Sequence, residues 1–150
     1  MRIRKIKDIF DWTRAFHSKL AEEYERLAEG HDRERVGILL NYLAQHERAL
    51  GAAIEHYEDD AVHKELELAY DPDLDLPPDI ESLSDKLENL DTAGVLKLAI
   101  QFHDVLVSVY ESLAEQAPNP DVQALFESIA RHENKEKLRA VRDAGRLEDL

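Results

Sequence analysis

Two histidines and two glutamates recur at matching intervals in this chain of 150 residues. Glu47 follows His17 by thirty residues, and Glu133 follows His103 by the same number. Imidazole nitrogens and carboxylate oxygens bind iron, manganese and zinc, and they also pair with each other as ions. The chain has no cysteine, which excludes disulfides, thiolate catalysis and cysteine-ligated metals. Two interpretations remain for these four residues: a metal site or buried ion pairs.

The matching intervals belong to an internal duplication with a constant offset of 86 positions. Between residues 16–47 and 102–133, 13 of 32 aligned positions are identical without a gap, where ordinary residue frequencies give roughly two or three. The identical pairs include Phe16 with Phe102, His17 with His103, Tyr24 with Tyr110, and Glu47 with Glu133. Core packing accounts for repeated leucines, but it gives no reason for His and Glu at the same depth in both halves.

Helices must carry these residues. The chain is 43% hydrophobic, with five glycines and five prolines, and its apolar residues recur at steps of three and four. This composition predicts an all-α, single-domain protein over residues 1–150. We expect a four-helix bundle made of two antiparallel hairpins, at 9–58 and 92–146, joined by a long crossover over 59–91.

The spacing predicts that all four residues meet in the middle of the bundle. In each half the histidine lies 15 residues before the turn centre and the glutamate 15 after it, the centres being Asp32 and Pro118. A helix rises about 1.5 Å per residue, so both members of a pair lie about 22 Å from their turn. A crossover that runs the length of the bundle puts the two turns at opposite ends, which brings both pairs to one level.

Other polar residues lie near this predicted layer. Glu136, one helical turn beyond Glu133, adds a third carboxylate, so the predicted metal ligands are His17, Glu47, His103, Glu133 and Glu136. Tyr24 and Tyr110 lie two turns along their helices and are expected to donate hydrogen bonds to ligand carboxylates. His46 and His132 are one step off the inward stripe, and we expect them at the flank or the surface.

The pattern resembles the ferritin-like superfamily, especially its rubrerythrin-like branch, over nearly the whole chain. That family places a Glu on the first and third helices of the bundle, often seven residues before a Tyr. In this chain His17 and His103 stand at those positions, seven residues before Tyr24 and Tyr110.

The resemblance extends to the second and fourth helices, where the family carries an ExxH motif. Glu47 and Glu133 match its Glu, whereas Leu50 and Glu136 replace its His. The resemblance implies a ferritin-like fold with an altered ligand set. It also implies iron, as one ion or a di-iron pair, and chemistry on oxygen or peroxide; the ligand types equally allow manganese or zinc.

Charge and composition restrict the partners. A formal net charge of -14 disfavours binding to nucleic acids and to anionic membranes. We expect no segment apolar enough to span a bilayer, a cytoplasmic location and a homodimer.

Two function classes are compatible with the sequence. The first is a ferritin-like metal-dependent oxidoreductase, in which Leu50 leaves a coordination position open for oxygen or peroxide. The second is a metal-free helical bundle that acts as a structural or protein-interaction module, with buried ion pairs fixing how its helices pack. The sequence identifies no catalytic residue, substrate or redox partner, and it leaves open whether the protein is an enzyme.

Overall fold

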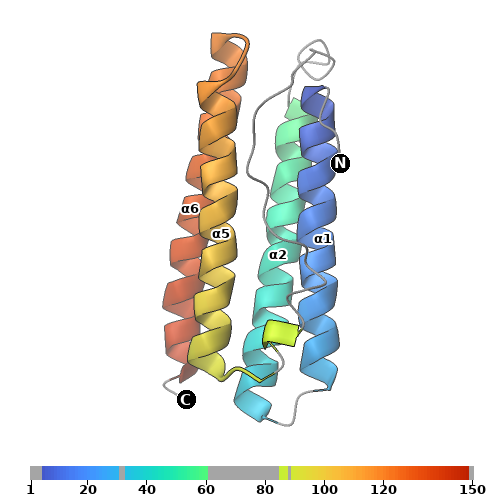
Figure 1. Cartoon of the computed structure of the whole chain (residues 1–150), viewed down its shortest axis with the longest axis vertical. Helices are drawn as coiled ribbons and strands as arrows, with labels where there is room; N and C mark the ends of the chain where they lie inside the picture. The colour runs from blue at the N-terminus through green and yellow to red at the C-terminus, as the bar shows by residue number, and fades with distance from the viewer. Residues whose placement is uncertain (1–4, 31–32, 61–84, 88, 149–150) are drawn as a thin grey trace.

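The described part of the structure, a computed structural model, comprises residues 5–30, 33–60, 85–87 and 89–148. Its four long helices are α1 (Ile6–Glu29), α2 (Glu34–Asp60), α5 (Thr92–Glu115) and α6 (Pro120–Glu148). Helices α1 and α2 form one antiparallel hairpin, α5 and α6 form a second, and the two lie side by side (Figure 1). The predicted all-α fold is therefore confirmed. Most of the predicted crossover, residues 61–84 and 88, lies outside the described residues.

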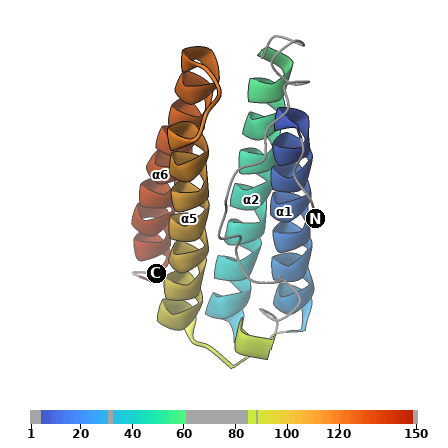
Figure 2. The same ribbon diagram turned by 45° about the horizontal axis from the view of Figure 1, so that its top comes forward.

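The two hairpins point in opposite directions along the bundle. The turn between α1 and α2 lies at the lower end in Figure 1, and the turn between α5 and α6 lies at the upper end. The turned view in Figure 2 shows the same arrangement, with α2 and α5 running in parallel. Residues that lie equally far from their own turns therefore meet near the middle of the bundle.

The apolar face of each helix explains why the hairpins associate. In α1 and α5 the buried residues recur at steps of three and four, as a packed helical face requires. Phe16 packs against Phe102 with ring centroids 6.1 Å apart, and Phe10 stacks on Phe126 at 6.4 Å. Both contacts join one hairpin to the other, so the hairpins share a single core.

Side-chain caps fix where the second hairpin's helices begin. The Asp91 carboxylate accepts a hydrogen bond from the Gly94 amide at 2.8 Å, at the start of α5. The Asn119 side chain accepts one from the Val122 amide at 2.9 Å, at the start of α6. Each cap satisfies an amide that has no partner within its own helix.

Helix α1 begins earlier than the predicted start of the first hairpin at residue 9. Its first residue is Ile6, which is fully buried, and Lys5 is the N-cap. The Asp8 carboxylate reaches back to accept a hydrogen bond from the Lys5 amide at 3.0 Å. Burial of Ile6 favours a helix that begins three residues earlier than predicted. Asp8 then lies within the first turn and stabilises it through this hydrogen bond.

Helix α5 is long and apolar enough, by length and composition, to cross a membrane, with a mean hydropathy of 1.3 in its most apolar stretch. The expectation that no segment meets this criterion was wrong, because α5 carries apolar side chains on more than one face. Within the bundle, 33% of that stretch is buried, and the buried residues of α5 include His103.

Candidate functional site

The four helices each contribute one residue to a buried polar layer. His17 comes from α1, Glu47 from α2, His103 from α5 and Glu133 from α6, and none is more than 2% exposed. The predicted meeting of both pairs in mid-bundle is therefore seen in the structure. We call these four residues the polar ring.

The polar ring is a closed cycle in which histidines and glutamates alternate. Within the hairpins, His17 Nδ1 lies 2.5 Å from Glu47 Oε2, and His103 Nδ1 lies 3.2 Å from Glu133 Oε2. Between the hairpins, His17 Nε2 lies 2.8 Å from Glu133 Oε1, and His103 Nε2 lies 2.8 Å from Glu47 Oε1. Each Nδ1 thus faces the glutamate of its own hairpin and each Nε2 faces that of the other. The ring has the approximate two-fold symmetry of the duplication.

One of the four contacts is weaker than its length suggests. His103 Nε2 and Glu47 Oε1 are close enough for an ion pair, but neither atom has a partner with hydrogen-bond geometry among the described residues. The other three contacts are hydrogen bonds. The His103 to Glu47 side is therefore held mainly by charge.

The four contacts of the ring call for four protons, one at each contact, and two protonated histidines can supply all of them. A carboxylate only accepts hydrogen bonds, and a neutral imidazole has a single N–H, so its second nitrogen would turn a lone pair toward an oxygen. Two imidazolium ions supply four N–H groups for four carboxylate oxygens. The ring then carries two positive and two negative charges and is neutral overall.

The electrostatics favour this ionised state. Burial by itself lowers the pKa of His17, but the nearby carboxylates of Glu133 and Glu47 outweigh it and raise the pKa to about 9. The same opposition, with Glu47 the strongest carboxylate, raises the pKa of His103 to about 10. Burial acts to raise the pKa of Glu133, yet the two histidines lower it to about 2. The pKa of Glu47 is also lowered, by His103 and His17 against burial.

The donor atoms of these four residues do not converge on one point, as a metal site requires. Iron, manganese or zinc needs several donors around one point, at about 2.0–2.2 Å for zinc with imidazole or carboxylate. Each ring nitrogen instead faces one carboxylate oxygen, at four separate places around the cycle. No group of three or more potential ligands in the described part of the chain could hold a metal ion. The residue types suit such a metal, but their arrangement fits two imidazolium ions.

Glu136, the fifth predicted ligand, is not part of the ring. Its side chain is 19% exposed and lies 3.9 Å from the Arg139 guanidinium. Its charge also acts, more weakly than burial, on the pKa values of Tyr42 and His46, which are both α2 residues. Leu50, where the ferritin-like pattern has a histidine, is buried and apolar.

The two predicted hydrogen-bond donors, Tyr24 and Tyr110, are buried beside the ring. Burial and the Glu47 charge raise the pKa of Tyr24 well above its usual value, and burial with the Glu133 charge does the same for Tyr110. The Tyr110 hydroxyl has no hydrogen-bond partner in the part of the chain that the structure describes. Neither tyrosine has a hydrogen bond to a ring carboxylate among the contacts described for these residues.

His46 belongs to the surroundings of the ring, which the sequence did not predict. It is only 8% exposed, and its ring meets that of His103 edge-on with centroids 5.6 Å apart. Burial, opposed by Glu47, lowers the pKa of His46, which favours a neutral imidazole beside His103. Its position in the sequence, immediately before Glu47, could have indicated that His46 lies next to the ring. Its counterpart His132 is partly exposed and packs edge-on against Tyr57.

The helical fold of this chain is similar to a ferritin-like fold. A solved structure from Thermotoga maritima, described as a "putative ferritin-like diiron-carboxylate protein", matches over 95% of both chains with a TM-score of 0.62. The two chains are 19% identical, so this similarity concerns the fold. No protein-family model and no curated protein matches this chain.

Proposed function

We propose that this protein is a metal-free ferritin-like bundle that acts as a structural or protein-interaction module. The observation that supports this function is the closed polar ring, in which every histidine nitrogen faces a carboxylate oxygen. Two imidazolium ions provide the positive charge that two metal ions would otherwise bring to the middle of the bundle. The ring is buried, so it offers no donor atom to a substrate, and interactions with other molecules are left to the surface.

The ring would serve to fix how the two hairpins pack. Each histidine contacts one glutamate of its own hairpin and one of the other, so sliding one hairpin along the other would break two buried contacts. Breaking a buried ion pair costs about 3–5 kcal/mol, because a charge is left without its partner. Replacing a whole buried pair by apolar residues costs far less stability. The ring is therefore better explained by its effect on how the hairpins pack than by a gain in stability.

Nitrogen-15 NMR of the histidine side chains tests the proposal directly. We expect both nitrogens of His17 and of His103 to carry protons at neutral pH, while His46 is a neutral imidazole. Elemental analysis of protein purified without chelator, then incubated with iron, manganese or zinc, is expected to show no stoichiometric metal. The unfolding temperature should be the same with and without a chelator.

A metal-binding function is the second candidate, and two observations favour it. The solved structure with the same fold is described as a diiron-carboxylate protein. Glu47 Oε1 and His103 Nε2 also lack hydrogen-bond partners in the described residues, which suits atoms that bind an ion. In this candidate, a rubrerythrin-like oxidoreductase, His17, Glu47, His103 and Glu133 would hold iron, and the iron would supply the chemistry on oxygen or peroxide.

The two candidates differ in one decisive measurement. Stoichiometric iron, manganese or zinc that is lost in both His17→Ala and Glu133→Ala would contradict the metal-free proposal. That result would also justify assays with oxygen and peroxide. Metal that persists in both variants would lie outside the ring, which would contradict a metal-free protein but not a metal-free ring.

A further inference from the structure

The outer faces of the two hairpins differ, although the duplication allows them to be compared residue by residue. In the first hairpin, Arg48 of α2 reaches across to Glu25 of α1, with contacts of 2.8 Å and 3.0 Å. The equivalent residues in the second hairpin are Asn134 and Glu111. An asparagine side chain is too short to repeat this bridge, so the second hairpin lacks the ion pair that covers the first.

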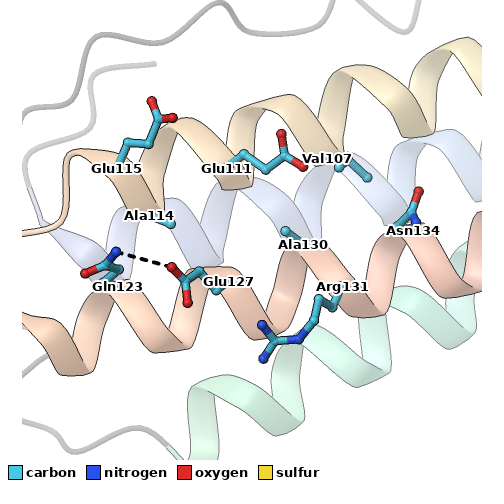
Figure 3. A pocket seen from close by; sticks show the side chains of 9 residues that line it. All are labelled: Val107, Glu111, Ala114, Glu115, Gln123, Glu127, Ala130, Arg131 and Asn134. Atoms are coloured by element: carbon cyan, nitrogen blue, oxygen red, sulfur yellow. Dashed lines mark hydrogen bonds between the residues drawn. The ribbon is translucent and has the colours of Figure 1, made fainter.

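A groove of about 470 Å³ opens between α5 and α6 at this place. Figure 3 shows its lining side chains on the two helices. The lining includes Val107, the buried Ala114 and Ala130, and the exposed carboxylates of Glu111, Glu115 and Glu127. Arg131 also lines it, so this end of the face has an excess of two negative charges.

The other half of the same face is apolar and basic. Leu138 and Val141 follow Asn134 along one side of α6, and they are 59% and 37% exposed. Lys97 of α5 and Arg142 of α6 are exposed at this end. Lys137 and Asp104 form an ion pair at 2.7 Å, and Arg142 forms one with Asp143 at 3.5 Å. Asp143 also lies 3.9 Å from Arg146, so two arginines share one carboxylate and this end keeps a positive excess. In the first hairpin, Ala52 and Glu55 take the places of Leu138 and Val141.

The acidic and basic ends lie at similar distances from the middle of the hairpin. Taking the level of the polar ring as the reference, Glu127 and Glu111 lie about 9 and 12 Å toward the turn. On the same scale, Lys97 and Arg142 lie about 9 and 13 Å in the other direction. A two-fold axis near Asn134 would therefore place the acidic end of one molecule on the basic end of another.

We propose that the outer face of α5 and α6 binds a second copy of this chain in an antiparallel, two-fold symmetric dimer. Because the interface is two-fold symmetric, each contact between the ends occurs twice. Leu138 and Val141, about 8 and 12 Å from the level of the polar ring, are covered by the partner and add apolar area to the interface. This inference does not depend on what the polar ring binds.

The size of the face suits such a dimer. A 24-residue helix is about 36 Å long, and two adjacent helices are about 20 Å wide, which gives roughly 700 Å² for each partner. A stable protein interface of standard size buries about 800 Å² on each side. The acidic protein repels its copies in most orientations, so a face with opposite charges at its two ends favours a defined orientation.

Sedimentation of the full-length protein over a range of concentrations tests the proposal. We expect a dimer that weakens as salt is added, since exposed charges are screened. The variant E111K/E127K makes the whole face basic, and K97E/R142E makes it acidic. Each should dimerise at least about 100-fold more weakly, because each substitution acts twice across the interface.

A mixture of these two variants gives the sharpest result. The basic face of one should bind the acidic face of the other, so the mixture should form a heterodimer although neither variant dimerises alone. The matched control is E25K/R48E, which exchanges the ion pair on the outer face of the first hairpin and should dimerise like the unchanged protein. Circular dichroism checks that all variants are folded.

Two outcomes would overturn the proposal. The first is an unchanged protein that stays monomeric at every concentration, which would mean that this face does not bind a second copy of the chain. The second is a dimer that forms equally well in E111K/E127K and in K97E/R142E but is lost in E25K/R48E, which would place the interface on the first hairpin.

Discussion

Each residue of the polar ring balances charges on two neighbours, so its removal affects more than one contact. His17→Leu leaves the buried carboxylates of Glu47 and Glu133 each with one histidine partner instead of two. We expect the free energy of unfolding of this variant, measured by urea denaturation, to be about 3–5 kcal/mol lower than that of the unchanged protein. Glu133→Leu should lower the free energy of unfolding by a similar amount, because His17 and His103 would each lose one of their two carboxylate partners.

A charge-free ring provides the control for this prediction. The variant H17Q/E47Q/H103Q/E133Q keeps polar side chains of similar size but removes all four charges. It should lose less stability than either single variant if uncompensated charge is the main cost. Single variants that lose under about 1 kcal/mol would contradict the ionised ring.

The pH dependence of stability follows from the shifted pKa values of the ring. His17 and His103 have raised pKa values, so their contribution is complete below 6.5 and is lost as pH rises through about 9 and 10. Glu47 and Glu133 have lowered pKa values, so their contribution is complete above 4.5 and is lost as pH falls toward about 2. The ring should therefore contribute most between about pH 4.5 and 6.5.

The charge-free variant also isolates this effect from the many surface carboxylates. The difference in unfolding free energy between the unchanged protein and that variant should be largest in this interval and fall on both sides. A difference that is constant with pH would mean that the ring does not change its charge in the way its contacts require.

At the scale of single helices, the cap of α5 gives a prediction. Asp91→Ala removes the acceptor for the Gly94 amide, and it should cost about 1 kcal/mol of unfolding free energy. Asn89→Ala, at an exposed position two residues earlier, should change the unfolding free energy by under about 0.5 kcal/mol. Equal losses in both variants would show that the cap does not stabilise α5.

Helix periodicity made most of the architecture predictable from the sequence. The repeated apolar steps and the duplication predicted the two hairpins, and equal distances from the turns predicted the mid-bundle layer. Glu136 lies outside the contacts of the ring, and its role as a metal ligand stays a prediction. Three residues rotate a side chain about 60° around the helix from Glu133, which here is enough to turn it away from the ring.

Residue types alone could not distinguish an ion-pair ring from a metal site. Both use histidine and glutamate at the same level, and the difference lies in whether each imidazole uses one nitrogen or two. That depends on side-chain rotation, which periodicity does not specify. The open groove, by contrast, was accessible from the sequence, because aligning the halves sets Asn134 against Arg48.

At the scale of the whole molecule, the ring and the shared aromatic core should make the two hairpins unfold together. Trp12, the single tryptophan, lies in the first hairpin, while far-UV circular dichroism reports on all four helices. We expect tryptophan fluorescence and circular dichroism to give the same urea midpoint for the unchanged protein. A fluorescence transition at lower urea would mean that the first hairpin unfolds on its own.

The symmetry of the polar ring also bears on how such a protein could have arisen. Exchange of the two hairpins converts every contact of the ring into another contact of the ring, down to which nitrogen meets which oxygen. A peptide of half this length, with one histidine and one glutamate, could therefore close the same ring by pairing with an identical copy. Fusion of two such genes would have turned that pairing into a single chain. Each half could then diverge at its surface, as Arg48 and Asn134 have done.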